Sequence, residues 1–249
     1  MSLRAARRAV ALSFALFLCI VRYWALRIRG PLSLEKRAEW LQVACRIVVA
    51  SLGIHCRVEG KPPSSGVVVS NHLSYLDIAI FSSVMECFFV SKAEVSRWPY
   101  FGEAARSGGT LFIDRSSVAS AEEVSAEITR RLSLPVPILF FPEGTSTDGS
   151  SVLRFHSRLF EPVIVAQAPI TPAAIRYVLS DGTPERELCW FGDAGFLPHL
   201  WKTLGTAGFT AEVRFGDRRI YPHRRVAADQ TYDEVVAMRA VDLVAQEQI

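Results

Sequence analysis

A histidine stands where an apolar run gives way to polar residues, in the stretch GVVVSNHLSYLDIAIF at residues 66–81. Asn71 precedes His72 directly, and Asp77 follows five residues later. If Ser74 caps a helix here, Asp77 takes its third position, and its carboxylate leans back toward His72. A carboxylate on one ring nitrogen leaves the other nitrogen as a base that can take a proton from an alcohol. The alternative is structural: Ser74 and Asp77 form a capping box that ties up free amides at the helix start.

Arg115 is the second candidate, at the end of the apolar run in GGTLFIDRSS, residues 108–117. An arginine after a strand offers a planar fork that suits a phosphate or a carboxylate. Alternatively, Asp114 and Arg115 form a solvated surface ion pair of little energetic consequence.

A third polar segment follows the apolar residues of ILFFPEGTSTDGS, residues 138–150. Gly144 permits close approach of the backbone to a ligand, and Glu143 and Thr145 can orient hydroxyl groups. An ordinary turn after a strand is the alternative. All three segments follow predicted strands, and ligands of parallel sheets collect at the carboxyl ends of strands.

The elements that must position these residues alternate beyond Arg57 between short apolar runs and helical stretches. This pattern predicts an α/β fold with a mainly parallel central sheet flanked by helices. We expect strands at residues 67–70, 87–91, 110–113, 138–141, 170–175, 187–191 and 210–215. We expect helices at 75–84, at 93–106 with an interruption at Pro99, at 119–132 and at 231–248.

The beginning of the chain is apolar and basic. Residues 9–21, AVALSFALFLCIV, span about 20 Å as a helix, which is too short to cross a hydrocarbon core of about 30 Å. Residues 35–54 form a second helical pattern beyond the turn at Pro31. We expect residues 1–56 to be a membrane-associating helical hairpin in one leaflet, followed by an α/β domain at 57–249. A single membrane span, a cleaved signal peptide and a buried soluble helix pair are the alternatives.

Composition agrees with contact with lipid. Hydrophobic residues make up 50% of the 249 residues, mean hydropathy is +0.21, and charged residues amount to 21%. The net charge of +3 is concentrated in residues 1–60, with ten basic residues against three acidic ones. We expect a membrane surface as a partner, and no nucleic acid. Five cysteines without paired spacing indicate a reducing compartment and neither a disulfide framework nor a zinc site.

Four segments together resemble the glycerolipid (lysophospholipid) acyltransferase family, which includes the 1-acylglycerol-3-phosphate acyltransferases. Asn71-His72 with Asp77 is similar to the N-H-x4-D signature of that family. GTLFIDR at 109–115, FPEGT at 141–145 and APITPAAI at 168–175 are similar to its second, third and fourth blocks. Four blocks in order are more specific than any one of them.

The resemblance implies transfer of a fatty acyl chain from a thioester to the free hydroxyl of a lysolipid. The donor would be acyl-CoA or acyl-ACP, with no cofactor. His72 would deprotonate the hydroxyl while Asp77 orients the ring, and no acyl-enzyme would form. The resemblance also implies association with the cytoplasmic face of a membrane, the inner membrane in a bacterium.

The resemblance also assigns residues to substrate binding. Arg115 and Lys92 would hold an acidic headgroup. The acceptor would be positioned by a further set of residues in the motifs, namely Asn71, Glu143, Gly144 and Thr145.

One departure from the family pattern concerns the acceptor. Many relatives carry an arginine after E-G-T and paired lysines further on, whereas this chain has Ser146 and then RFHSRLF at 154–160. FPEGTSTDG and FGDAGFLPHLW are more similar to members that act on lyso-ornithine lipid or other lysophospholipids. We expect 1-acyl-sn-glycerol-3-phosphate, the commonest acceptor of the family, with lyso-ornithine lipid or another lysophospholipid as the alternative.

Two rival functions are a hydrolase that uses Ser70 or Ser74, and a noncatalytic membrane scaffold. The hydrolase is disfavoured because the sequence has no G-x-S-x-G elbow. His156, His199 and His223 lack ligand spacing, so no metal is expected. Trp190 and Trp201 are expected to serve packing or an interface.

Overall fold

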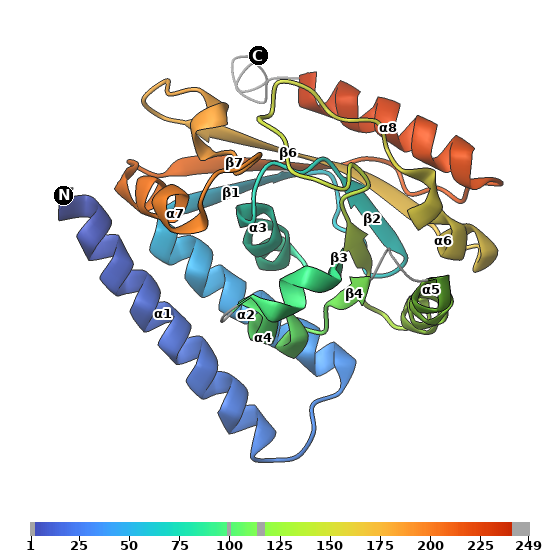
Figure 1. Ribbon diagram of the computed structural model, residues 1–249, viewed down its shortest axis with the longest axis horizontal. Helices are drawn as coiled ribbons and strands as arrows, with labels where there is room; N and C mark the ends of the chain where they lie inside the picture. The colour runs from blue at the N-terminus through green and yellow to red at the C-terminus, as the bar shows by residue number, and fades with distance from the viewer. Residues whose placement is uncertain (1–2, 99–100, 114–117, 241–249) are drawn as a thin grey trace.

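A twisted sheet of seven strands, counted over the described residues, lies at the centre of the molecule with helices on both faces (Figure 1). The computed structural model describes residues 3–98, 101–113 and 118–240. The strand order is β1-β7-β6-β2-β5-β3-β4. The strands that run parallel to one another are β6 (Ile170–Leu179), β2 (Val67–Ser70), β5 (Ile138–Phe140), β3 (Phe88–Lys92) and β4 (Leu111–Ile113). β7 (Phe209–Phe215) is antiparallel to β6, and β1 (Ile54–Glu59) is parallel to β7. The expected α/β fold with a mainly parallel sheet is therefore confirmed.

The two faces of the sheet carry different helices. Alternate strand residues point to opposite faces, so Val68 belongs to one hydrophobic cluster and Val69 to the other. The first cluster draws side chains from α1 (Leu3–Arg27), α2 (Leu34–Leu52), α3 (Leu76–Val84) and α7 (Phe196–Gly205). The second draws on α5 (Val118–Leu132), α6 (Glu161–Val165) and α8 (Arg224–Ala240), together with Ala38 at the start of α2. Burial on both faces explains why the strands read as continuous apolar runs.

One edge of the sheet gathers the segments that matter for chemistry. The loops that follow β2, β3 and β5 leave from this edge, because these strands are parallel. β7 and β1 run the opposite way and therefore begin at the same edge. α7 and the first turns of α1 lie there too, since Arg8 donates hydrogen bonds to the carbonyls of Thr206 (2.7 Å) and Ala207 (3.2 Å).

The two N-terminal helices differ in their surroundings. α2 is capped by the Ser33 hydroxyl and ends at Gly53, whose φ of 70° is left-handed. Its inner side, including Trp40, is buried in the core, and Arg46 donates to the carbonyl of Ser83 in α3 (2.9 Å). α2 thus packs as a helix of the α/β domain, and the expected boundary after residue 56 falls inside β1.

α1, in contrast, is mostly exposed. Among the described residues it is the one helix long and apolar enough to cross a membrane by length and composition. Only 11% of its most apolar 18-residue window is buried. The outer layer of this end of the molecule is therefore a single apolar helix (Figure 1).

Several elements depart from the expectation. β1 and α7 were not predicted, and the strand expected at residues 187–191 is wrong. A 3-10 helix (Glu185–Leu188) covers the first two residues of that segment, and the N–H of Trp190 donates to the carbonyl of Leu73 rather than to a strand (2.9 Å). Residues 93–106 form a 3-10 helix (Ala93–Arg97) and α4 (Phe101–Ser107), two elements as Pro99 predicted. α8 begins earlier than the expected residue 231.

Candidate active site

The backbone of His72 is held from both sides by the turn after β5. The N–H of His72 donates to Glu143 Oε1 (2.6 Å), and its carbonyl accepts from the N–H of Thr147 (2.9 Å). His72 lies two residues beyond the end of β2, at the carboxyl edge of the sheet. β2 and the turn after β5 together fix the backbone position of His72, from which the imidazole projects.

The ring of His72 is oriented by a carboxylate and a phenyl ring. Its Nδ1 lies 2.7 Å from Asp77 Oδ2, and the ring stacks on Phe141 at 4.0 Å with an interplanar angle of 11°. Because a carboxylate only accepts, Nδ1 carries the proton of the neutral ring and Nε2 carries the lone pair. Nε2 has no protein partner among the described residues, and the side chain is 20% exposed. This is the geometry that a general base needs.

Asp77 is completely buried and carries out both roles that the sequence left open. Its Oδ2 accepts from His72 and also from the N–H groups of Leu73 (2.7 Å) and Ser74 (3.1 Å). The same oxygen therefore closes the turn and steers the imidazole. Ser74 takes part in the cap, since its Oγ accepts a hydrogen bond from the N–H of Leu76 (3.4 Å). Helix α3 begins at Leu76, one residue later than a cap at Ser74 predicts.

Tyr177 completes the shell around Asp77, and the sequence analysis missed it. Its hydroxyl donates to Asp77 Oδ1, and the residue is 2% exposed near the carboxyl end of β6. Burial, followed by the charge of Asp77, raises the pKa of Tyr177 well above its usual range, so the phenol keeps its proton. The available signal was a polar ring two residues beyond Ile175 and hence on the same face of the strand.

Glu143 contacts backbone groups on both of its oxygens. Besides the amide of His72, it accepts from the N–H of Leu153 (2.6 Å), and it is 3% exposed. Burial raises the pKa of Glu143 to about 7. Gly144 takes a left-handed φ of 75° in the same turn, and Thr145 is exposed beside it. The carboxylate thus fixes the histidine, and Thr145 faces solvent.

Asn71 links two strands. Its Nδ2 donates to the carbonyl of Ile175 (3.1 Å), and its Oδ1 accepts from the N–H of the same residue (2.9 Å). This pairing continues the ladder between β2 and β6 beyond its last register pair, Ser70 with Ala173. The side chain is 1% exposed, so it supports the turn from within.

The two predicted headgroup cations differ in what can be said of them. Lys92 is the exposed last residue of β3, at the same sheet edge as His72. Asp114 and Arg115 lie outside the described residues. The binding roles predicted for Lys92, Arg115 and the turn residues stay predictions.

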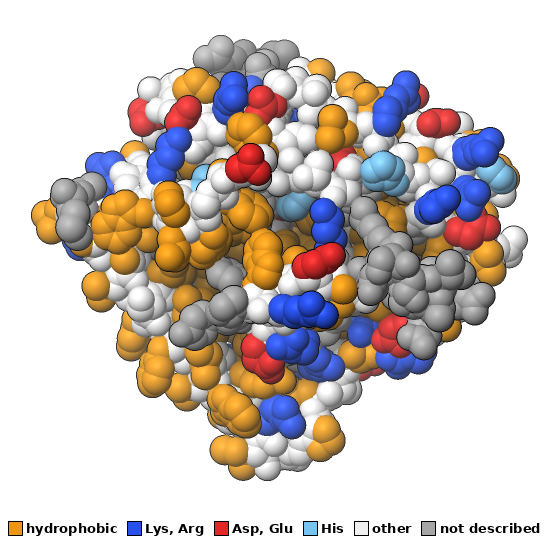
Figure 2. Space-filling model, viewed as in Figure 1, with side chains coloured by type: hydrophobic (Ala, Val, Ile, Leu, Met, Phe, Trp, Pro, Cys, Tyr) orange, Lys and Arg blue, Asp and Glu red, His pale blue; other side chains and the backbone are white. Residues whose placement is uncertain are grey.

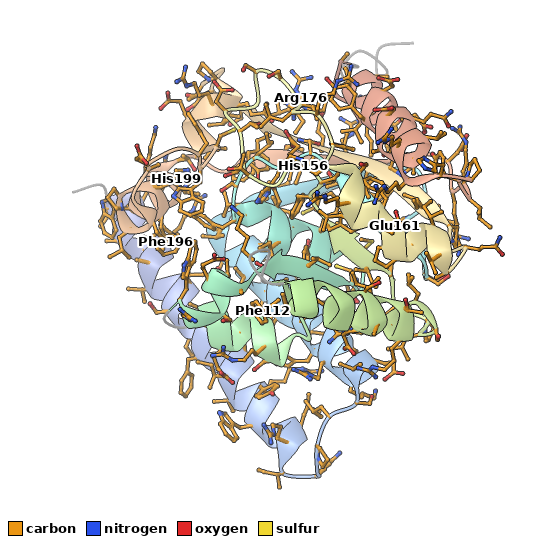
Figure 3. The ribbon with its side chains drawn as sticks, turned by 45° about the vertical axis from the view of Figure 1, so that its right-hand side comes forward. Phe112, His156, Glu161, Arg176, Phe196 and His199 are labelled. Carbon is orange, nitrogen blue, oxygen red and sulfur yellow. The ribbon has the colours of Figure 1, made fainter. Side chains whose placement is uncertain are left out.

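A second histidine lies nearby in a different environment. His199 Nε2 lies 3.2 Å from the carbonyl of Leu188, so Nε2 carries the proton and Nδ1 accepts from the Tyr75 hydroxyl (3.0 Å). Burial lowers the pKa of His199, which keeps the ring neutral. Figure 3 places His199 and Phe196 on α7. Both rings contact Tyr75, as does Trp190, so His199 belongs to an aromatic cluster.

Within the described ranges, no group of three or more His, Cys, Asp or Glu side chains could hold a metal ion. The serines proposed for a hydrolase are fully buried, and the ring of His72 bonds to neither Ser70 nor Ser74.

The fold and the site together place an imidazole, paired with a carboxylate through Nδ1, at the carboxyl edge of an α/β sheet. Comparison with known proteins identifies the family. The acyltransferase family profile matches residues 54–176. Over 170 residues the chain is 39% identical to lyso-ornithine lipid O-acyltransferase of Rhodobacter capsulatus, with 66% of this chain and 61% of that protein covered. Over 174 residues it is 32% identical to 1-acyl-sn-glycerol-3-phosphate acyltransferase of Neisseria meningitidis, with 68% of each covered. The chain therefore belongs to the acyltransferase family, and the resemblance inferred from its motifs is confirmed.

A solved structure agrees on the fold. The crystal structure of the 1-acyl-sn-glycerophosphate (LPA) acyltransferase PlsC from Thermotoga maritima superposes with a TM-score of 0.66 at 16% identity. The match covers 96% of this chain and 99% of that one. The chain spans 61% of the length of its R. capsulatus relative.

Proposed function

We propose that the protein is a membrane-surface O-acyltransferase that moves a fatty acyl chain from a thioester to the hydroxyl of a lysolipid. One observation carries this proposal: the Nδ1 of His72 is held by Asp77 at 2.7 Å while Nε2 is left open at the sheet edge. Membership of the acyltransferase family supplies the reaction class. Acyl-CoA or acyl-ACP is the donor, and the cytoplasmic face of a membrane is the location.

The mechanism needs one base and no covalent enzyme intermediate. Nε2 of His72 removes the proton from the acceptor hydroxyl as its oxygen attacks the thioester carbonyl. The C–O bond forms, the C–S bond breaks, and the imidazolium returns its proton to the departing thiolate. Asp77 stabilises the imidazolium in between. Positioned base catalysis of this kind contributes about 10² to 10⁴ in rate.

We propose lyso-ornithine lipid as the acceptor. The relative of higher identity carries that name, and the sequence motifs that depart from the commoner pattern agree with it. Ser146 replaces the arginine of many relatives, and its hydroxyl donates to the carbonyl of Trp190, so this position anchors a loop and supplies no charge. An ornithine headgroup, with a carboxylate and an amine, needs fewer cations than a phosphate monoester. The second candidate is 1-acyl-sn-glycerol-3-phosphate, which the Neisseria relative favours.

The test is incubation of the purified full chain with one labelled acyl-CoA or acyl-ACP and a panel of lysolipids, followed by identification of the product. We expect labelled ornithine lipid and no acid release without acceptor. Phosphatidic acid as the main product would move the assignment to the second candidate. Release of free fatty acid that does not depend on an acceptor would make the protein a hydrolase and overturn the proposal.

The variant Asp77→Asn tests whether the carboxylate orients the base. It keeps the size of the side chain but presents an amide to ring and backbone donors, so the wrong histidine tautomer is favoured. We expect transfer to fall by about two orders of magnitude or more. Unchanged transfer would remove the oriented base from the mechanism.

A further inference from the structure

α1 exposes a long apolar surface. A narrow stripe of Ala5, Leu12, Ala15 and Cys19 is buried against the domain. The outward side carries large apolar side chains, including Leu3, Val10, Phe14, Phe17, Ile20 and Trp24, each at least 55% exposed. As a helix of 25 residues it is about 37 Å long. A contiguous apolar surface of this kind marks an interaction site on a protein.

α7 continues this surface at the active-site edge. Leu197 (72% exposed) and Trp201 (40% exposed) are four residues apart and share one side of the helix. His199 and Thr203, on the opposite side, are buried. Figure 2 shows hydrophobic side chains gathered over both α7 and α1 on the same face of the molecule. We define the α1–α7 apolar surface as these exposed side chains of the two helices.

The charges around the surface indicate the chemistry of its partner. α1 holds five arginines and no acidic residue, namely Arg4, Arg7, Arg8, Arg22 and Arg27. Apolar side chains between arginines match the two layers of an anionic bilayer, the acyl region and the headgroups. A second protein would need acidic groups spaced along a helix of this length.

We propose that α7 is a second lipid-contacting element, and that the α1–α7 apolar surface lies against an anionic phospholipid bilayer. A single helix lying in an interface can roll about its axis. A second contact away from that axis fixes the roll and therefore which edge of the sheet faces the lipid. On the inner side of α7, His199 contacts the hydroxyl of Tyr75, and Tyr75 lies three residues after His72 in the sequence. The contact thus brings the catalytic turn to the membrane, a consequence that rests on the proposed lysolipid acceptor.

The test is flotation with vesicles of equimolar phosphatidylglycerol and phosphatidylcholine, without substrate. The double variant Leu197→Ser/Trp201→Ser should partition about tenfold more weakly than the wild type. Ile220→Ser/Val236→Ser is the matched control, since these residues are also exposed and apolar (63% and 38%) but lie elsewhere on the protein. Equal partitioning of the two double variants would overturn the proposal.

A second measurement does not depend on the fold of that variant. Brominated phosphatidylcholine should quench the wild-type tryptophan fluorescence more strongly than that of Trp201→Phe, and equal quenching would also overturn the proposal. If the wild type is a dimer in the absence of lipid, and Leu197→Ser/Trp201→Ser dissociates it, the exposed side of α7 binds a second copy of the chain and the proposal is overturned. Vesicle partitioning is measured without acyl transfer. Failure of the acyltransferase assay and failure of the lipid-contact proposal are therefore separate results.

A separate observation, the hydroxyl of Tyr177 on Asp77, carries a second inference. Oδ2 of Asp77 accepts hydrogen bonds from three donors. Among the described residues, Oδ1 accepts a hydrogen bond from the hydroxyl of Tyr177 alone. We infer that Tyr177 is a positioning residue that holds the carboxylate in the plane that His72 needs. The tyrosine is buried and does not touch the open side of the imidazole.

Tyr177→Phe removes only this hydroxyl and keeps the ring packed on Phe209. We expect kcat for acyl transfer to fall about tenfold, with KM for donor and acceptor unchanged. A carboxylate that loses a donor binds the imidazolium more strongly, so the acidic limb of the pH profile should move to higher pH. The other ionisable groups that face Asp77 and Tyr177 are Glu143, Cys189 and Glu185, which the variant leaves in place.

Phe209→Leu is the control, because it disturbs the packing of the same tyrosine ring without removing the hydroxyl. It should leave the pH profile where it is. An unchanged kcat and pH profile in Tyr177→Phe, or an equal shift in Phe209→Leu, would overturn the inference.

Discussion

α1 and the turn around His72 depart from the usual distribution of residues in opposite ways. At the turn, polar side chains are buried, as Asn71, Asp77 and Glu143 show. On α1, large apolar side chains such as Phe14 and Phe17 are exposed. Globular proteins ordinarily bury apolar groups and expose charges. The difference is where each region finds its partners.

The turn finds its partners within the chain. Each of its three buried polar side chains has its oxygens bonded to backbone or side-chain donors. A buried polar group without such partners costs about 1–3 kcal/mol or more. α1 has no equivalent cover over its outer side in the described residues. The turn is thus complete within the chain, whereas the outer side of α1 lacks protein cover among the described residues.

The largest expected effect falls on the turn. His72→Ala should lower acyl transfer at least about a hundredfold, because the base is lost, with little change in the melting temperature. His223→Ala, an exposed histidine elsewhere, should keep wild-type activity. The measurement is initial rate with labelled thioester at saturating acceptor. Retained activity in His72→Ala would show that the turn serves structure alone.

The next effect tests the other side of the comparison. Phe14→Ser/Phe17→Ser should weaken binding to anionic vesicles about tenfold or more and leave thermal stability intact, because these side chains are mostly exposed (62% and 59%). Deleting residues 1–53 is not an equivalent test, since it removes α2 and its buried Trp40 from the core. Flotation measures the binding. A loss of stability in the double variant, with unchanged flotation, would mean that α1 is a covered helix.

A smaller effect concerns how the buried carboxyl group of Glu143 makes the free energy of unfolding depend on pH. The pKa of Glu143 is raised from 4.5 to about 7, so in that window the folded protein holds a proton that the unfolded chain has lost. This residue therefore makes the free energy of unfolding fall as pH rises from 4.5 to about 7, by at most about 1.4 kcal/mol per pH unit. Glu143→Gln should remove that contribution to the slope, measured by urea unfolding across the window. Identical slopes would show that the folded and unfolded carboxyls titrate alike.

The smallest effect belongs to the exposed rim of the site. Lys92→Ala should raise KM for an acidic lysolipid about threefold with kcat unchanged, because a solvated cation contributes little binding free energy. Lys61→Ala, exposed beyond β1 at the opposite edge, is the control. Steady-state kinetics with varied acceptor measures both. An unchanged KM in Lys92→Ala would remove this lysine from the headgroup site.

Much of the fold and site could be predicted because the signals are local. His72 and Asp77 are five residues apart, so one turn of chain brings them together. Buried parallel strands such as β2 read as continuous apolar runs. β1 escaped prediction because, as an edge strand with its later residues exposed, it lacks that run. α7 escaped because Gly and Pro residues surround and interrupt its short pattern.

By itself, the sequence determined the pairing of His72 with Asp77, the strands behind them and the apolar character of α1, since each depends on neighbours within a few residues. Only the tertiary structure decided that Tyr177 supports Asp77, that Asn71 and Glu143 bind backbone, and that α2 belongs to the core. In the site, these contacts join residues that are separated by 71 to 104 positions in the sequence. The contact between α2 and α3 joins residues separated by 37 positions. Such pairings arise from strand order and helix packing, which no local periodicity encodes.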